Sequence, residues 1–95
     1  MSGKARSTIQ VDNDQVRVTE WRFGRDDATG WHRHDYDYVV VPMTVGPLRI
    51  RTAQAEVSND IVPGQAYFRV AGAEHDVWNP NDREVIFVEI ELEPR

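Results

Sequence analysis

Residues 64–79, with the sequence GQAYFRVAGAEHDVWN, decide how this chain folds. Two short runs rich in aromatic and β-branched residues, Ala66 to Val70 and His75 to Trp78, flank a turn at Ala71-Gly72. Neither run repeats its apolar residues every three or four positions, as an amphipathic helix would. The stretch therefore predicts two β-strands joined by a short connection, with Pro63-Gly64 as the turn before the first.

The same alternation of short apolar runs and turn residues continues in the rest of the chain. We predict further strands, separated by turns rich in Gly, Pro, Asn and Asp, and almost no helix. These strands cover Thr8 to Val11, Val16 to Phe23, Gly30 to His34, Tyr36 to Pro42, Leu48 to Ala53 and Val85 to Leu92. So many short strands in 95 residues suit a β-sandwich or a small barrel, and periodicity alone does not choose between them.

Alternation along two of these strands separates faces of different chemistry. The last strand has two faces. The apolar face consists of Ile86, Val88, Ile90 and Leu92, and the mainly acidic face consists of Phe87, Glu89, Glu91 and Glu93. Alternation does not say which face is inside. Glu89 is therefore an outward acid or, if it is buried near a metal, a general base. Arg49 and Arg51 share a face that is solvated or, if turned inward, marks an anionic substrate.

Composition narrows the function classes. Lys and Arg contribute 11 residues and Asp and Glu 16, which gives a net charge of −5 without any basic stretch, so nucleic acid is not an expected partner. The chain has no Cys, which excludes disulfides and thiolate metal sites. The sequence has no long apolar run and no hydrophobic signal, so we expect no membrane partner and a cytoplasmic location. A core of this size gains from burial between subunits, so we expect a homodimer.

Two of the three histidines form the sequence His32-Arg33-His34, and the third is His75. Residues two apart on a strand project from the same face, so His32 and His34 can chelate one ion. His75 likewise follows a turn that contains glycine. The alternative is that the pair lies at the surface or is half buried, and that His75 is a structural, hydrogen-bonded residue.

At these residues the sequence resembles the cupin superfamily, which carries the motifs G-x5-H-x-H-x3,4-E-x6-G and G-x5-P-x-G-x2-H-x3-N. The second motif matches at every position except its proline, where this chain has Val70, and the matching residues are Gly64, Gly72, His75 and Asn79. The first motif matches at His32 and His34. At the position of its leading glycine this chain has Asp26. At the position of its glutamate it has Tyr38 or, in the longer spacing, Val39.

The resemblance implies an all-β fold, the double-stranded β-helix or jelly-roll barrel, which is commonly dimeric. Residues 1–95 then form a single cupin domain, with the barrel core at about 16–92 and an N-terminal strand at about 8–11. It also implies a divalent metal ion near one mouth, held by His32, His34 and His75. Fe, Mn, Ni, Zn and Cu all accept imidazole, so the ion stays open. Sites with three histidines are similar to those of thiol and some diketone dioxygenases.

Tyr38 stands where the family has its carboxylate. It could be a phenolate ligand, donate a hydrogen bond to substrate, or fill space, and its ordinary pKa of about 10 favours the last two. Tyr36 and Tyr38 share the parity of the two paired histidines, so both are candidates to orient a substrate. The other aromatic residues near the histidines are expected mostly in the core, namely Trp31, Tyr67, Phe68 and Trp78. Asp35 and Asp37 have the opposite parity and are expected to face solvent.

These residues support two functions. The first is a metal-dependent enzyme acting on a small organic molecule, as a dioxygenase-like oxygenase, an isomerase or a lyase. The second is a non-catalytic module that binds or senses a ligand or metal, because a fold does not fix a function. A purely structural role for the histidines is the weakest hypothesis, because all three occupy ligand positions of the resemblance.

Overall fold

The computed structural model describes residues 3–93, which form nine strands and no helix. Accordingly, this part of the chain has no helix with the length and apolarity needed to span a membrane. The strands are β1 (Arg6–Asp12), β2 (Val16–Phe23), β3 (His32–Arg33), β4 (Asp37–Pro42), β5 (Leu48–Arg51), β6 (Glu56–Asn59), β7 (Tyr67–Arg69), β8 (Glu74–Trp78) and β9 (Val85–Leu92).

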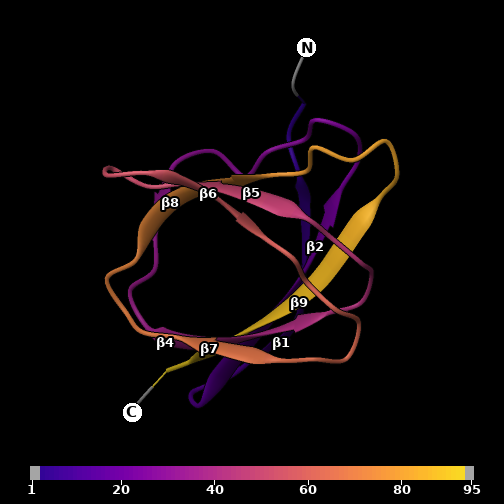
Figure 1. Cartoon of the computed structure of the whole chain (residues 1–95). Coiled ribbons are helices and arrows are strands. Elements are labelled where there is room, and N and C mark those ends of the chain that lie inside the picture. The colour runs from indigo at the N-terminus through magenta and orange to yellow at the C-terminus, as the bar shows by residue number, and fades with distance from the viewer. Residues whose placement is uncertain (1–2, 94–95) are drawn as a thin grey trace.

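Two antiparallel sheets face one another, as Figure 1 shows. One has the strand order β1-β2-β9-β4-β7 and the other the order β3-β8-β5-β6. The longest pairing joins β2 to β9, without a register shift, from Val16 opposite Leu92 to Phe23 opposite Val85. Strands distant in sequence are neighbours in both sheets, and the fold is the predicted double-stranded β-helix.

The predicted strands differ from the observed ones where the pattern is polar. β2 and β9 have the predicted bounds, whereas Gly30 to His34 contracts to the two residues of β3. β6 was not predicted, because its sequence Glu-Val-Ser-Asn reads as an exposed turn. Pairing with β5 makes it a strand even though most of it is exposed, so tertiary pairing outweighs local propensity here.

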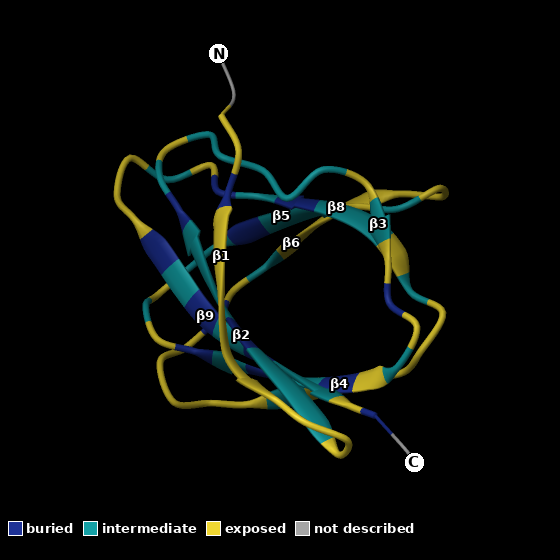
Figure 2. Cartoon of the chain, turned by 180° about the vertical axis from the view of Figure 1, so that it is seen from behind, coloured by how far each residue is buried: buried dark blue, intermediate teal, exposed yellow. Residues whose placement is uncertain are grey.

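The acidic side of β9 faces into the barrel. β4 alternates between buried Tyr38 and Val40 and less buried Val39. Across β9, Val40 lies opposite Glu89 and Val39 opposite Ile90. The mainly acidic face of β9 is therefore the inner one, and its apolar face is the outer one. Figure 2 shows the buried segments on β9 and β5, in contrast with β1, which is exposed throughout.

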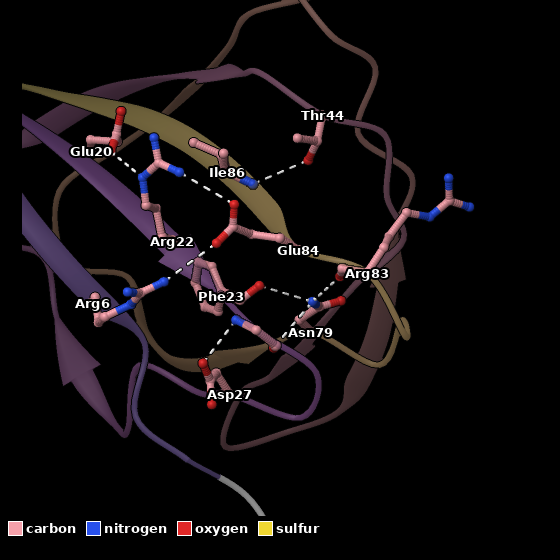
Figure 3. A network of polar contacts seen from close by, with 11 residues as sticks. Arg6, Glu20, Arg22, Phe23, Asp27, Thr44, Asn79, Arg83, Glu84 and Ile86 are labelled. Atoms are coloured by element: carbon pink, nitrogen blue, oxygen red, sulfur yellow. Dashed lines mark hydrogen bonds and ion pairs between the residues drawn. The ribbon is translucent and has the colours of Figure 1, made fainter.

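Well-packed side chains fill one end of the barrel. Phe23, Pro42, Asn79 and Val85 are almost wholly buried there, and the rings of Phe23 and Phe87 lie 5.5 Å apart. The Asn79 amide donates to the carbonyl oxygens of Phe23, Gly24 and Arg83 at 3.1, 3.2 and 2.8 Å (Figure 3). The last residue of the second motif thus ties β2, β8 and the start of β9 together.

Three of the aromatic residues expected in the core are not there, since Trp78 is half buried on the outer face of β8 and two others are exposed. Trp31 and Phe68 are 53% and 51% exposed. Trp31 lies in the bend before β3, and Phe68 pairs with outward-facing Val39. Tyr67, its neighbour, points the other way and packs against the core. Aromatic character alone therefore did not decide burial in this chain.

Candidate metal centre and cavity

Three histidine side chains meet at the end of the barrel opposite Asn79. His32 on β3 lies directly across from His75 on β8, which brings residues distant in sequence into one pair. His34 follows β3, where its backbone N–H donates to Ala73 at 2.9 Å and its carbonyl accepts from Gly72 at 2.8 Å. These two bonds fix the segment that carries His34 beside β8, so both sequence motifs contribute to one site.

Two distances between the Nε2 atoms match the spacing of ligands to one ion. His34 Nε2 lies 3.1 Å from that of His32 and 3.2 Å from that of His75. Ligands at about 2.1 Å from one ion are about 3.0 Å apart at a right angle and about 3.4 Å apart at the tetrahedral angle. All three ligand atoms lie within 4.8 Å of one another, so the residues fit a metal ion.

The tautomer of His32 also suits a ligand. Its Nδ1 lies 2.9 Å from the carbonyl oxygen of Gly30, which can only accept, so Nδ1 carries the hydrogen and donates it. In the neutral ring, Nε2 then has a free lone pair directed at the cluster. Metal-binding histidines are commonly oriented in this way through the other ring nitrogen. Gly30 itself has a φ of +85°, which favours glycine at this turn.

Burial keeps two of the histidines neutral. Burial, together with the neighbouring His32 and His75, lowers the pKa of His34 to about 4. Burial also lowers the pKa of His75 to about 4, with His32 and Arg69 acting in the same direction and Asp76 opposing them. Neutral imidazole is the form that coordinates a metal, so protons compete little with the ion at neutral pH.

An apolar cavity of about 260 Å³ adjoins the cluster, and His32 and His75 lie in its wall. The polar residues among its other lining groups are few, and its aliphatic part is formed by Val40, Leu48, Ile50, Val57 and Val77. An apolar pocket with a few convergent polar groups is typical of a site for a small molecule.

Glu89 places a carboxylate inside this cavity. The side chain is 8% exposed, and Oε2 lies 3.9 Å from His34 Nε2. Burial, with a smaller contribution from Glu91, raises the pKa of Glu89 to about 7, and a hydrogen bond from Trp21 opposes the rise. The two positions of the first motif where a glutamate could stand, both on β4, carry no carboxylate, but the neighbouring strand β9 supplies one.

Tyr38 contacts the cluster through its ring. The ring stacks on His34 with a centroid distance of 4.0 Å, and the residue is 3% exposed. Burial, followed by the charge of Glu89, raises the pKa of Tyr38 to about 12. Tyr38 is therefore a neutral phenol that fills the space beside His34 and lines the cavity.

Tyr36 lies away from the histidines, contrary to the expectation from parity. It lines a separate hollow of about 580 Å³ together with Asp14, Asp35, Asp37 and Glu93. Residues 34–36 are not part of a strand, so counting alternate residues from His34 to Tyr36 does not apply. Asp35 and Asp37 are exposed as predicted, although Asp37 also accepts a hydrogen bond from the Ala71 N–H at 2.8 Å.

Arg49 and Arg51 face outward, which settles their two interpretations in favour of solvent. Both pair with Glu56, at 2.8 and 3.8 Å, and Arg51 lies 5.0 Å from the centroid of the outward Trp78 ring. Sequence reasoning missed two cavity residues, Trp21 and Arg69. Arg69 stands at a variable position of the second motif, and Trp21 lies outside both motifs. Trp21 shares the alternation of buried Thr19 and Phe23 along β2, which was the available signal.

Comparison with solved structures identifies the family. A cupin domain from Bordetella pertussis is 51% identical to this chain, with a TM-score of 0.95, and the match covers 97% of this chain and 96% of that one. The chain belongs to the cupin superfamily. An RmlC-like cupin with a double-stranded β-helix fold from Methanocaldococcus jannaschii has a TM-score of 0.78 at 11% identity, covering 95% and 81% of the two chains, and shows the same fold.

A curated relative adds a biological context. This cupin is 52% identical to the beta-alanine degradation protein BauB of Pseudomonas aeruginosa over 94 residues, which cover 97% of this chain and 99% of BauB. No family model matches the chain. Cupins commonly bind metals, and in this cupin the three histidines could hold one.

Proposed function

We propose that this cupin holds one divalent transition metal through His32, His34 and His75 and acts on a small organic molecule in the adjoining cavity. The observation that carries the proposal is the convergence of three Nε2 atoms at the wall of an apolar cavity. At about 260 Å³ the cavity lies below the roughly 300–1,000 Å³ of drug-sized sites, which favours a small metabolite. A bound metal would supply a Lewis acid with positions open to substrate or dioxygen. The expected reaction is a dioxygenase-like oxidation, or an isomerase or lyase step.

The chain's own residues have distinct parts in this function. Gly30 orients His32 through the Nδ1 hydrogen bond. Glu89 faces the cluster from β9, and we assign it the part that the first motif gives to its glutamate, that of the carboxylate at the metal site. Tyr38 offers a phenol hydrogen to a substrate while its ring supports His34.

The relative supports a substrate context. The Pseudomonas protein is named for β-alanine degradation. We extend that context to this chain, because β-alanine and compounds of its size fit a cavity of about 260 Å³. Binding without turnover is the alternative, in which the same site senses or stores a ligand.

Metal loading tests the site directly. We expect chelator-treated protein to bind one equivalent of Zn(II) or Ni(II) in calorimetry and to gain thermal stability. His75→Ala should weaken binding by more than about a hundredfold, because the loss of even an outer hydrogen-bond partner commonly costs 10- to 100-fold. Glu74→Gln, an exposed neighbour on β8, is the matched control and should bind as the parent does. A parent protein that takes up no metal, or a His75→Ala variant with full affinity, overturns the proposal.

Turnover separates the enzyme from the binding module. Protein loaded anaerobically with Fe(II) should consume oxygen with at least one compound among thiols, diketones, phenols and β-alanine. Metal-loaded protein that turns over none of them, and that instead shows saturable binding, contradicts the enzyme and supports the alternative.

We also propose a homodimer formed through the outer face of the five-stranded sheet. Val18, Ile90, Val39 and Phe68 form one apolar row across four paired strands. The same face carries Glu20 and Arg22, so charges of both signs lie beside the row and can pair across a twofold axis. Light scattering should give twice the 11.0 kDa of one chain, and a monomeric mass at micromolar concentration rejects the dimer. A cytoplasmic location without membrane or nucleic-acid partners stays a prediction from composition.

A further inference from the structure

Arg69 differs from the other arginines of this protein. Seven of the arginines within residues 3–93 lie beside a carboxylate, namely Arg6, Arg17, Arg22, Arg25, Arg33, Arg49 and Arg51. In the same part of the chain Arg69 and Arg83 form no ion pair, and of these two only Arg69 lines the cavity. Its guanidinium is thus a cation at the binding cavity without an acidic partner in the described chain.

The fold holds this guanidinium in a defined place. On β7, Arg69 lies opposite Tyr38 of β4 and on the same inner face as Tyr67. Its guanidinium carbon lies 4.5 Å from the centroid of the Tyr67 ring, and Nη1 donates to the Phe68 carbonyl at 2.9 Å. The Tyr67 hydroxyl accepts a hydrogen bond from Asn59 at 3.2 Å, which fixes the ring beneath the guanidinium. Arg69 is exposed at the rim of the cavity, and these contacts orient its guanidinium before an anion binds.

Arg69 is close enough to the histidine cluster to share a ligand with it. Its positive charge makes a small contribution at both residues: it opposes the burial that raises the pKa of Tyr38 and adds to the burial that lowers the pKa of His75. Arg69 and His75 both lie in the wall of the same cavity of about 260 Å³. The aliphatic groups Val40, Ile50 and Val57 line that cavity as well and suit a short hydrocarbon segment.

We infer that Arg69 binds the carboxylate of a small organic acid whose other end reaches the histidine cluster. This inference rests on the proposed function, because it assigns the substrate class of that same site. A guanidinium forms two parallel hydrogen bonds with a planar carboxylate, which gives orientation as well as affinity. Glu89 faces the same cavity from β9. Its negative charge disfavours a ligand bound the other way round, with the ligand carboxylate beside Glu89. Neutral diketones and phenols without an acid group are disfavoured as substrates.

Two probes of nearly the same shape test this assignment. Propionate and propionamide differ in charge but hardly in size, and each can be titrated into Zn(II)-loaded protein and followed by NMR. We expect propionate to bind about tenfold or more tightly than propionamide, because hydrogen bonds to charged groups contribute more than neutral ones. Methylphosphonate distinguishes a planar carboxylate site from a general anion site. Equal binding of propionate and propionamide, or tighter binding of methylphosphonate, overturns the inference.

Variants then locate the effect. Arg69→Gln should lose the preference for propionate and still bind Zn(II) within about twofold of the parent. Arg51→Gln is the matched control, since Arg51 also lies over an aromatic ring but pairs with Glu56 on the outer surface, and it should keep the preference. An Arg69→Gln variant that keeps the preference overturns the inference. Failure of the proposed function and failure of this inference give different results. A parent protein that does not bind Zn(II) refutes the proposed function. A parent protein that binds Zn(II) but does not prefer the carboxylate refutes only the part given to Arg69.

Discussion

The two ends of this barrel differ in how their interiors are filled. The packed end, formed by Phe23, Pro42, Asn79 and Val85, is closed by side chains that are almost wholly buried. Its polar member, Asn79, uses both its donor and acceptor atoms, since Oδ1 also accepts from the Asn81 N–H at 2.9 Å. A buried polar group with all its partners costs little, so this end stabilises the fold.

The histidine end, formed by His32, His34, His75 and Glu89, is organised around a cavity. Burial lowers the pKa of two of these histidines and raises that of the glutamate, so the protein keeps titratable groups where their charged forms are unfavourable. Such shifts accumulate where a site is prepared for a ligand, at a cost to stability. The comparison indicates that packing at the packed end offsets the unfavourable burial of titratable groups at the histidine end.

Truncation of matching residues on β2 is the strongest test of this division. Phe23→Ala should lower the free energy of unfolding by about 3–5 kcal/mol, the usual cost for a fully buried phenylalanine. Trp21 lies two residues earlier on the same inner face but lines the cavity. Because the cavity already leaves part of the indole without packing partners, Trp21→Ala should cost less. Urea denaturation of both metal-free variants measures the two effects, and an equal or larger loss for Trp21→Ala would break the comparison.

Sequence patterns predicted the parts of this molecule that depend on local order. The spacing of His32 and His34, together with the motif around His75, indicated the cluster that the structure brings together. The bounds of β9 followed from regular alternation, and those of β2 from the turn residues on either side of it. β6 was missed, because only its pairing with β5 makes those four residues a strand.

The remaining site residues depend on which face of a strand is inside. Alternation showed that Glu89 opposes the apolar residues of β9, but only the closure of the barrel turns the acidic face inward. The usual preference for apolar residues inside would give the wrong answer on this strand. Arg69 became a candidate only once β7 lay beside β4 with its guanidinium facing the cavity. Tyr36 shows the reverse case, in which a bend between strands interrupts the alternation.

A smaller effect should appear in the pH dependence of stability when Glu89 is neutralised. In the metal-free protein the pKa of Glu89 is about 7, against 4.5 as the ordinary value for an unfolded chain. Between these values the unfolded state releases the proton that the folded state keeps, so rising pH destabilises the fold through this group. Glu89→Gln removes that cost. It should therefore match the parent below about pH 4.5 and exceed it by roughly 1–3 kcal/mol above pH 7.

The histidines do not alter this difference between variant and parent. The lowered pKa values of His34 and His75 reduce stability as pH falls from 6.5 toward about 4, and they do so in both proteins. Glu91→Gln is the matched control, because Glu91 lies on the same inner face of β9, is less buried and does not line the cavity. Its gain should be smaller than that of Glu89→Gln. Urea denaturation at pH 4, 6 and 8 measures the gap, and a gap that stays constant with pH would show that Glu89 is not held against its charge. If Glu89 is the carboxylate of the metal site, Glu89→Gln should weaken Zn(II) binding and also stabilise the metal-free fold. Glu89 would then lower the stability of the histidine end and raise its affinity for the metal.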